Sequence, residues 1–314
     1  MWFKNLRVFR LLPTWSLSAQ ELEDALSPQA FAKEQENKSA MQRLGWVPVR
    51  DDRGLVYAQD GQYLIALRSE KKLLPTSVIN QFAQDKAQAM EEQQGYKPGK
   101  RQMKEIKEQV TDELLPRAFS LYRDTRVWID TKNHWLVVDA GSSAKSDEVL
   151  GLLAKAIEPF PVEPLLVQQS PAACMTSWLV DAEPIEGFSI DQDAELASTQ
   201  TGGGKIRYVR ESVALDDAQK HIQEGKQCTR LAMTWNDRVS FVLTDSFDIK
   251  RITPLDVLQG EANTAQNEAE QFDADFALMT GEINGLLANL VQVLGGERVE
   301  QQSSAPSGAE LQAA

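Results

Sequence analysis

The sequence predicts an α+β protein with antiparallel sheets and a helical insertion. Short segments of alternating polarity, joined by pairs such as Asp60-Gly61, recur along the chain and are typical of β-hairpins. Between them, Thr76 to Val110 is rich in Gln, Lys, Glu, Ala and Met, which favour helix. Near the end, apolar residues recur at helical spacing from Phe272 to Leu294. Strands and helices that occur in separate runs are characteristic of the α+β class.

The chain begins with a strand and a helix. Residues 6–12 form a compact β-like segment, and Ser18 and Glu21 have the spacing of a capping box. The helix that this box opens carries Leu22 and Leu26 on one face. A hairpin follows over residues 55–67, because Asp-Gly supplies the positive φ angles of a tight two-residue turn.

The helical insertion is expected to form two helices, over about 76–93 and 98–113, because Gly95 and Pro98 break the segment; Pro98 would lie near the first turn of the second helix. Basic residues recur there at spacings of three and four and therefore share one face. They are Lys97, Lys100, Arg101, Lys104 and Lys107. Such a face is either simply solvated or binds a polyanion, and its pattern alone leaves both interpretations open.

The second half of the chain returns to strands. A hairpin is predicted over 127–138, and a helix over 146–157 leads to a Pro-rich connection at 161–164. In Lys205-Ile206-Arg207-Tyr208 the two basic side chains share one face of a strand. A third hairpin over 231–243 extends into a meander through 247–252. The final helix is predicted to stop at Gly295-Gly296, before a small polar tail over 301–314 that we expect to be disordered.

The charge of the chain is distributed unevenly. Its 314 residues carry 33 Lys+Arg and 46 Asp+Glu, a formal net charge of -13. Residues 1–120 hold 18 basic and 16 acidic residues, which leaves 15 basic and 30 acidic residues for 121–314. No Lys or Arg occurs from 252 to 297. A basic surface is therefore compatible with the overall acidity.

The residues that most enzymes need are scarce. There are two His and two Cys, and Cys174 and Cys228 are far apart, so we expect reduced, partly buried thiols and no metal or cofactor. The Gly-rich turn 201–205 lacks the first glycine and the final Ser or Thr of a phosphate-binding loop. The acidic run 191–195 lacks the glycine that a calcium loop requires. Because these motifs are incomplete, the chain is predicted not to be an enzyme. Without a signal peptide or a long apolar stretch, it is predicted to be a cytoplasmic protein that does not contact a membrane.

Several short segments resemble those of one known family. In chain order they are Trp2-Phe3-Lys4-Asn5-Leu6, Gly45-Trp46-Val47-Pro48, Leu73-Leu74-Pro75 with Val78-Ile79, Leu114-Leu115-Pro116-Arg117-Ala118-Phe119, Trp128-Ile129-Asp130-Thr131, and Phe272-Asp273-Ala274-Asp275-Phe276 with Met279-Thr280-Gly281-Glu282. Together they resemble the RdgC family of bacterial recombination-associated proteins, over about residues 2–297.

This resemblance implies a nucleoid-associated protein that binds DNA without sequence preference and restrains the RecA recombinase. It also implies a ring-shaped homodimer of horseshoe subunits that encircles double-stranded DNA; binding of single-stranded DNA stays open. Each subunit would have a central α+β domain (1–75 and 120–165), a helical tip domain (76–119) and a base domain (166–300).

The resemblance and the basic segments together give a set of site residues. Phe119 corresponds to an aromatic residue at the contact between tips, although its position at a helix end also fits an ordinary core residue. Arg210 corresponds to a basic position associated with DNA contact. The expected DNA-binding residues are Lys97, Lys100, Arg101, Lys104, Lys107, Arg117, Lys205, Arg207 and Arg210. The alternative is an interaction protein whose acidic C-terminal half binds a recombinase directly.

Overall fold

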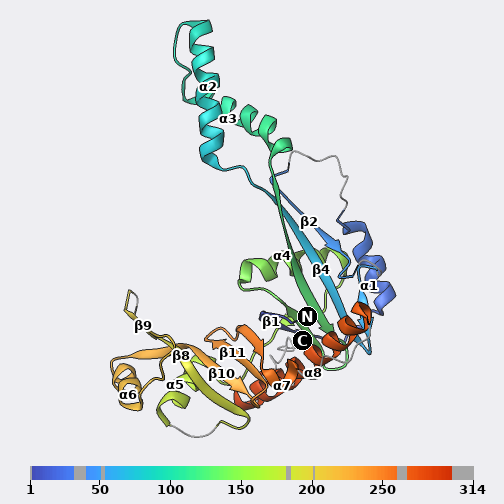
Figure 1. Ribbon diagram of the computed structural model, residues 1–314, viewed down its shortest axis with the longest axis vertical. Helices are drawn as coiled ribbons and strands as arrows, with labels where there is room; N and C mark the ends of the chain where they lie inside the picture. Colours follow the sequence, from blue (N-terminus) through green and yellow to red (C-terminus); the bar gives the residue numbers. More distant parts are fainter. Residues whose placement is uncertain are drawn as a thin grey trace, which may run out of the picture. The chain divides into compact units, whose positions relative to one another are not determined.

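The computed structural model describes residues 2–31, 40–50, 54–181, 185–200, 202–259 and 267–298. The chain divides into two compact units, one formed by Phe3–Glu163 and the other by Pro164 onward together with the first two residues. Each unit combines an antiparallel sheet with helices, which confirms the predicted α+β class (Figure 1). The expected disordered tail at 301–314 lies outside the described residues.

The first unit contains an antiparallel sheet in the order β2-β4-β5-β6-β1, with β3 beside β4 and β7 beside β1. Its strands are β1 (Asn5–Leu11), β2 (Gln42–Val47), β3 (Tyr57–Gln59), β4 (Gln62–Lys72), β5 (Ser120–Asp130), β6 (Trp135–Val138) and β7 (Val162–Pro164). Its helices are α1 (Ala19–Leu26), α2 (Thr76–Gln94), α3 (Lys100–Leu114) and α4 (Ser143–Ala156).

Helices α1 and α4 share one hydrophobic core with this sheet. Leu22 and Leu26 of α1 are fully buried there, together with Ile65, Val127 and Val149. The capping box forms as predicted, since the Ser18 side chain accepts from the Glu21 amide and the Glu21 carboxylate accepts from the Ser18 amide. The local sequence thus fixes where α1 begins and which face it buries.

The predicted hairpin between β3 and β4 turns at Asp60 and Gly61, which have φ angles of 50° and 78°. The strands that follow are longer than the sequence indicates. β4 and β5 pair without interruption from Gln62 and Asp130 to Lys72 and Ser120. The helical insertion starts directly after the end of this long pair.

The insertion is a helical hairpin with a small core of its own. Ala83 of α2 and Ile106 and Val110 of α3 are buried between the two helices. Gly95, with a φ angle of 79°, ends α2 as predicted. α3 starts two residues after the approximate position predicted, residue 98. The helix begins at Lys100 because the Gln102 side chain accepts from the amide of Gly99 at 3.0 Å. Pro98 and Lys97 therefore precede the helix.

The second unit has an antiparallel sheet in the order β12-β11-β10-β8-β9. Its strands are β8 (Phe188–Ser198), β9 (Lys205–Tyr208), β10 (Lys226–Trp235), β11 (Val239–Thr244) and β12 (Ile249–Pro254). Its helices are α5 (Pro171–Asp181), α6 (Leu215–Gln223), α7 (Asp256–Gln259) and α8 (Glu268–Val293). The predicted meander corresponds to β10, β11 and β12.

Helices pack on one face of this second sheet. The indole nitrogen of Trp235 donates to Asn289 of α8 at 2.9 Å. A Cβ atom added at Gly285 would lie 2.7 Å from the Trp235 ring, so this close approach requires glycine. As predicted, α8 stops before Gly295 and Gly296, which have φ angles of 85° and 91°.

Both cysteines are free and buried, as expected from the sequence. The Cys174 thiol donates to the Gln169 side chain, and burial raises its pKa above the ordinary value. Burial raises the pKa of Cys228 to about 12. Among the described helices none combines the length and apolarity that a membrane crossing requires.

Candidate nucleic-acid interface

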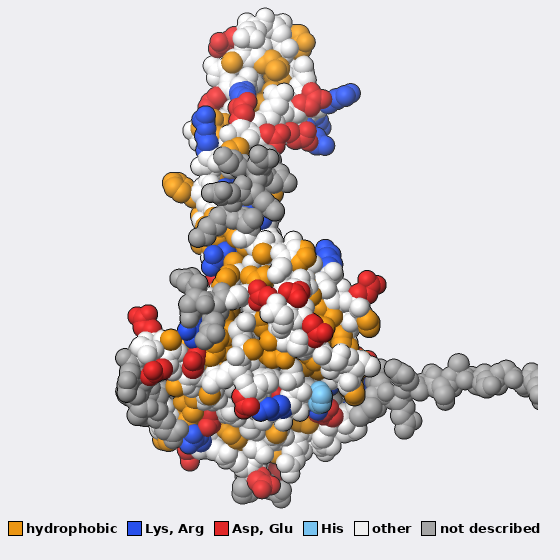
Figure 2. Space-filling view, turned by 90° about the vertical axis from the view of Figure 1, so that its right-hand side faces the viewer, with side chains coloured by type: hydrophobic (Ala, Val, Ile, Leu, Met, Phe, Trp, Pro, Cys, Tyr) orange, Lys and Arg blue, Asp and Glu red, His pale blue; other side chains and the backbone are white. Residues whose placement is uncertain are grey.

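Exposed cations follow α3 in the helical insertion. Lys100, Arg101, Lys104 and Lys107 are all exposed on this helix, and Lys97 is exposed in the turn before it. Arg101 and Lys104 reach acidic residues one turn later on the same helix, at 3.2 and 3.7 Å. In the described parts of the chain, Lys100 and Lys107 have no carboxylate partner. On the face shown in Figure 2, Lys and Arg side chains in the upper part of the molecule lie beside Asp and Glu side chains.

The segment after α3 brings Arg117 and Phe119 to the surface. Arg117 ends a short 3-10 turn over Leu115–Arg117 and is exposed. The Phe119 side chain is 83% exposed, so the alternative that it is a core residue of this chain is wrong. The Phe119 carbonyl accepts from the amide of Leu73, which is 50% exposed. Two apolar side chains thus emerge together where the insertion joins β4 and β5.

The paired strands β4 and β5 carry a buried carboxylate that sequence reasoning missed. Glu70 is 4% exposed and accepts from Arg43 at 2.7 Å, Ser120 at 2.6 Å and Tyr122 at 3.3 Å. Burial alone would raise the pKa of Glu70, but hydrogen bonds from Ser120 and Arg43 and the charges of Arg43 and Lys72 hold it below its ordinary value. Only the cross-strand pairing of β2, β4 and β5 brings these residues together.

In the second unit, strand β9 has the predicted cationic face. Lys205 and Arg207 are exposed, whereas Ile206 and Tyr208 are half-buried. Lys205 forms an ion pair with Glu195 of β8 at 3.4 Å, and Arg207 lies directly opposite the same residue. β9 lies at the end of the strand order, so its cations lie along an edge of the sheet.

Arg210 follows β9 in a turn with a φ angle of 56°, an unusual value for a residue other than glycine. Its amide donates to Asp193 at 2.8 Å, and the next amide, of Glu211, donates to the Gln192 carbonyl at 3.0 Å. These two hydrogen bonds fix the turn against β8. The Arg210 side chain is exposed and lines a groove on the face of the sheet.

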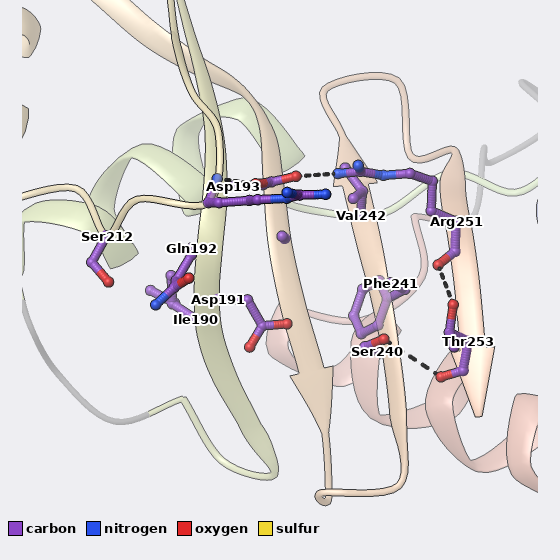
Figure 3. Close-up of a pocket in the computed structure, with 12 residues that line it drawn as sticks. Ile190, Asp191, Gln192, Asp193, Ser212, Ser240, Phe241, Val242, Arg251 and Thr253 are labelled. Atoms are coloured by element: carbon purple, nitrogen blue, oxygen red, sulfur yellow. Dashed lines mark hydrogen bonds and ion pairs between the residues drawn. The ribbon is translucent and has the colours of Figure 1, made fainter. Parts of the chain in front are cut away.

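That groove has a volume of about 730 Å³ and is lined by residues of β8, β10, β11 and β12 together with the turn after β9 (Figure 3). Cations on this face that sequence reasoning missed are Arg230, Lys250 and Arg251. Arg251 forms an ion pair with Asp193 at 2.7 Å. The pKa of Asp193 is lowered by the hydrogen bonds from the Arg210 amide and the Arg251 guanidinium, and by the charges of Arg251 and Arg207.

The predicted site residues thus form two groups, one in each unit. The first group contains Lys97, Lys100, Arg101, Lys104, Lys107 and Arg117, with Phe119 beside them in sequence. The second contains Lys205, Arg207 and Arg210. All nine basic side chains are exposed. Their role in DNA binding, and that of Phe119 in a dimer contact, stay predictions.

Comparison with known proteins identifies the family of the chain. Residues 1–297 match the family model described as "Putative exonuclease, RdgC". The recombination-associated protein RdgC of Bordetella parapertussis is 59% identical over 299 residues, covering 95% of this chain and 99% of that protein. Proteins of the same name from Burkholderia ambifaria and Herminiimonas arsenicoxydans are each 54% identical, over 299 and 302 residues, covering 95% and 96% of this chain and 97% and 100% of theirs. The chain belongs to the RdgC family of recombination-associated proteins.

Proposed function

We propose that this protein binds DNA through the sugar-phosphate backbone, without sequence preference, and thereby restrains recombination. The observation that carries this proposal is the pair of exposed cationic groups, on α3 and along β9, in a chain whose relatives are named for recombination. Lys and Arg that neutralise phosphates release condensed counterions, which supplies affinity for any sequence. Base-reading side chains are not required for such binding.

The homodimer implied by the family resemblance extends this proposal. Two subunits that meet through Phe119 at their tips, and again at their bases, would form a ring with DNA inside. The acidic run 252–297 would then suit an outer surface, because it would repel DNA that approaches from outside. The three-domain organisation, the ring and a nucleoid location in the cytoplasm all belong to this proposal.

The protein would restrain the RecA recombinase by occupying the DNA on which RecA acts. A protein held on DNA by many phosphate contacts excludes other proteins from the same stretch. The competing proposal is direct binding of the recombinase by the acidic run 252–297. A pull-down of purified RecA with and without nuclease separates the two, because co-purification that survives nuclease supports direct contact.

The salt dependence of binding tests the central claim. We expect the logarithm of the association constant for duplex DNA to fall linearly with the logarithm of salt concentration, by about 0.9 for each phosphate contact. Unrelated sequences of equal length should give the same slope in fluorescence anisotropy. An affinity that does not change with salt, or that depends strongly on sequence, would contradict the proposal.

The family description includes the word exonuclease, so the same preparations should be tested for nucleotide release. We propose that binding alone accounts for the function. DNA labelled at either end and incubated with Mg²⁺ or Mn²⁺ should remain intact at protein concentrations that saturate it. Degradation that co-purifies with the protein through several columns would favour a nuclease instead.

A further inference from the structure

Strand β8 carries an irregularity at the acidic run 191–195. Ile190 pairs with Met233 and Ala194 pairs with Leu231, so three residues of β8, Asp191 to Asp193, lie opposite the single residue Ala232. Extra residues of this kind bend a strand and redirect its side chains. Asp191 accepts from the Thr234 hydroxyl at 2.9 Å. Asp193 is directed instead across the open face of the sheet (Figure 3).

Strand β12 has a second bulge, which redirects an arginine. Ser240 pairs with Thr253 and Val242 pairs with Lys250, so Arg251 and Ile252 both lie opposite Phe241. Arg251 has a φ angle of 54°, in the left-handed region that normally favours glycine. Residues held in such strained backbone conformations cluster at functional sites. The side chain of Arg251 is directed toward β8 (Figure 3).

The two bulges bring Asp193 and Arg251 together although β10 and β11 separate their strands. Their ion pair spans the groove described above, which Arg210 also lines. Arg210 has a left-handed backbone as well, and its amide donates to the same Asp193 carboxylate. Arg210 and Arg251, both with left-handed backbone conformations, therefore contact the same carboxylate, Asp193.

We propose that Arg251 and Arg210 form a phosphate-binding pair in this groove, held in place by Asp193, for a phosphodiester group of the DNA backbone. This inference rests on the proposed function and adds Arg251 to the residues that carry it. A guanidinium group has five N–H donors, and its planar fork matches phosphate oxygens. Arg251 donates one hydrogen bond to Asp193, and its side chain is 58% exposed. The Arg210 side chain makes no hydrogen bond to another described residue.

The charge around the groove is compatible with an anion. Arg210 and Arg251 balance the two carboxylates that line it, Asp191 and Asp193. On the same face of the sheet, Arg207 acts electrostatically on Asp193, and Arg230 acts in the same way on Glu195. Among these residues, the four arginines Arg207, Arg210, Arg230 and Arg251 face the three carboxylates Asp191, Asp193 and Glu195, so a phosphate between Arg210 and Arg251 would meet a small excess of positive charge. Arginine side chains commonly hold phosphate through paired hydrogen bonds.

Replacement of Arg251 by Gln tests the inference on the full-length protein with a duplex of fixed length. We expect the slope of log association constant against log salt to decrease in magnitude by about 0.9, and the affinity at 0.1 M salt to fall about fivefold to tenfold. Arg251→Lys, which retains the charge, should keep most of the slope. Lys220→Gln is the matched control, because it removes one exposed positive charge from α6, which does not line the groove.

The outcomes separate this inference from the proposed function. Salt-dependent binding by the wild type with an unchanged slope in Arg251→Gln would overturn the phosphate pair and leave the proposed function standing. Absence of salt-dependent binding by the wild type would overturn both. If Arg251→Gln loses its fold, as judged by circular dichroism, Arg210→Gln provides the same test, because its backbone amide still donates to Asp193. An unchanged slope in that variant would also overturn the pair.

Discussion

Glu70 shows how a single buried charge is retained in the first unit. The carboxylate lies between β2 and β5 and receives hydrogen bonds from the Arg43, Ser120 and Tyr122 side chains. A paired buried charge adds little net stability, whereas removal of one partner leaves the other without compensation. A change at Glu70 should therefore destabilise the pairing of β2, β4 and β5.

We expect Glu70→Gln to lower the free energy of unfolding at pH 7 by about 1–3 kcal/mol, because Arg43 loses its charged partner. The folded chain holds the pKa of Glu70 below its ordinary value of 4.5. Its contribution is therefore fully present above that value and disappears as the pH falls below it. Urea unfolding between pH 7 and pH 3 should show a flatter pH dependence in the variant.

Glu105→Gln provides a control for this prediction, because Glu105 is exposed and, among the residues that the structure describes, pairs only with Arg101 of the same helix. That change should alter the free energy of unfolding by less than about 0.5 kcal/mol. Equal effects of the two substitutions would show that the burial of Glu70 has no energetic consequence.

At the scale of elements, α3 carries two kinds of cation: Arg101 and Lys104 pair with acids of the same helix, whereas Lys100 and Lys107 pair with no carboxylate in the described part of the chain. We expect the double variant Lys100→Gln, Lys107→Gln to reduce the magnitude of the salt slope for DNA binding by about 1.8, or two phosphate contacts. The pair Arg101→Gln, Lys104→Gln should have a smaller effect, because both residues already interact with acids on the helix. Anisotropy titrations at four salt concentrations measure both slopes. Identical slopes in all proteins would exclude α3 from the interface.

Local sequence signals predicted most of the elements. The Asp60-Gly61 turn, the Ser18 cap and the glycines after α2 and α8 each specify backbone geometry within a few residues, and each was confirmed. β8 was not predicted, because its run of acidic residues is typical of a loop. Its bulge also depends on pairing with β10, which lies more than thirty residues away in sequence. α3 begins two residues after the approximate predicted position, where the Gln102 side chain accepts from the amide of Gly99.

At the scale of the whole molecule, one of the two proposed dimer contacts, the contact between tips, depends on Phe119. We expect Phe119→Ala to leave the free energy of unfolding within about 0.5 kcal/mol of the wild type, because the ring is 83% exposed. If the ring fills a pocket of a second subunit, the dimer dissociation constant should rise at least about tenfold. Sedimentation equilibrium measures this constant, and retention on closed circular DNA should decrease in parallel.

Tyr96→Ala is the matched control, since Tyr96 is an aromatic residue of the same insertion and is 59% exposed. It should change neither the dissociation constant nor the retention on circular DNA. A dimer that tolerates Phe119→Ala would show that Phe119 does not contribute to the contact between tips.

The site as a whole was only partly predictable from the sequence. Cations at helical or alternating spacing, such as Lys104 and Arg207, can be recognised because their neighbours in sequence share a face. Arg251 and Asp193 are 58 residues apart, and two irregular strands bring them into contact. The spacing of these residues in the sequence cannot predict their contact, because the contact depends on how β8, β10, β11 and β12 pair.

The two buried thiols have a practical consequence. Cys174 and Cys228 are the only cysteines of the chain, and burial raises the pKa of each. Thiolate is the reactive form, so maleimide reagents should leave both native residues unmodified in the folded protein. A cysteine introduced at an exposed position such as Phe119→Cys can therefore be labelled or cross-linked without a cysteine-free background. Covalent closure of a dimer around circular DNA then requires only this single substitution.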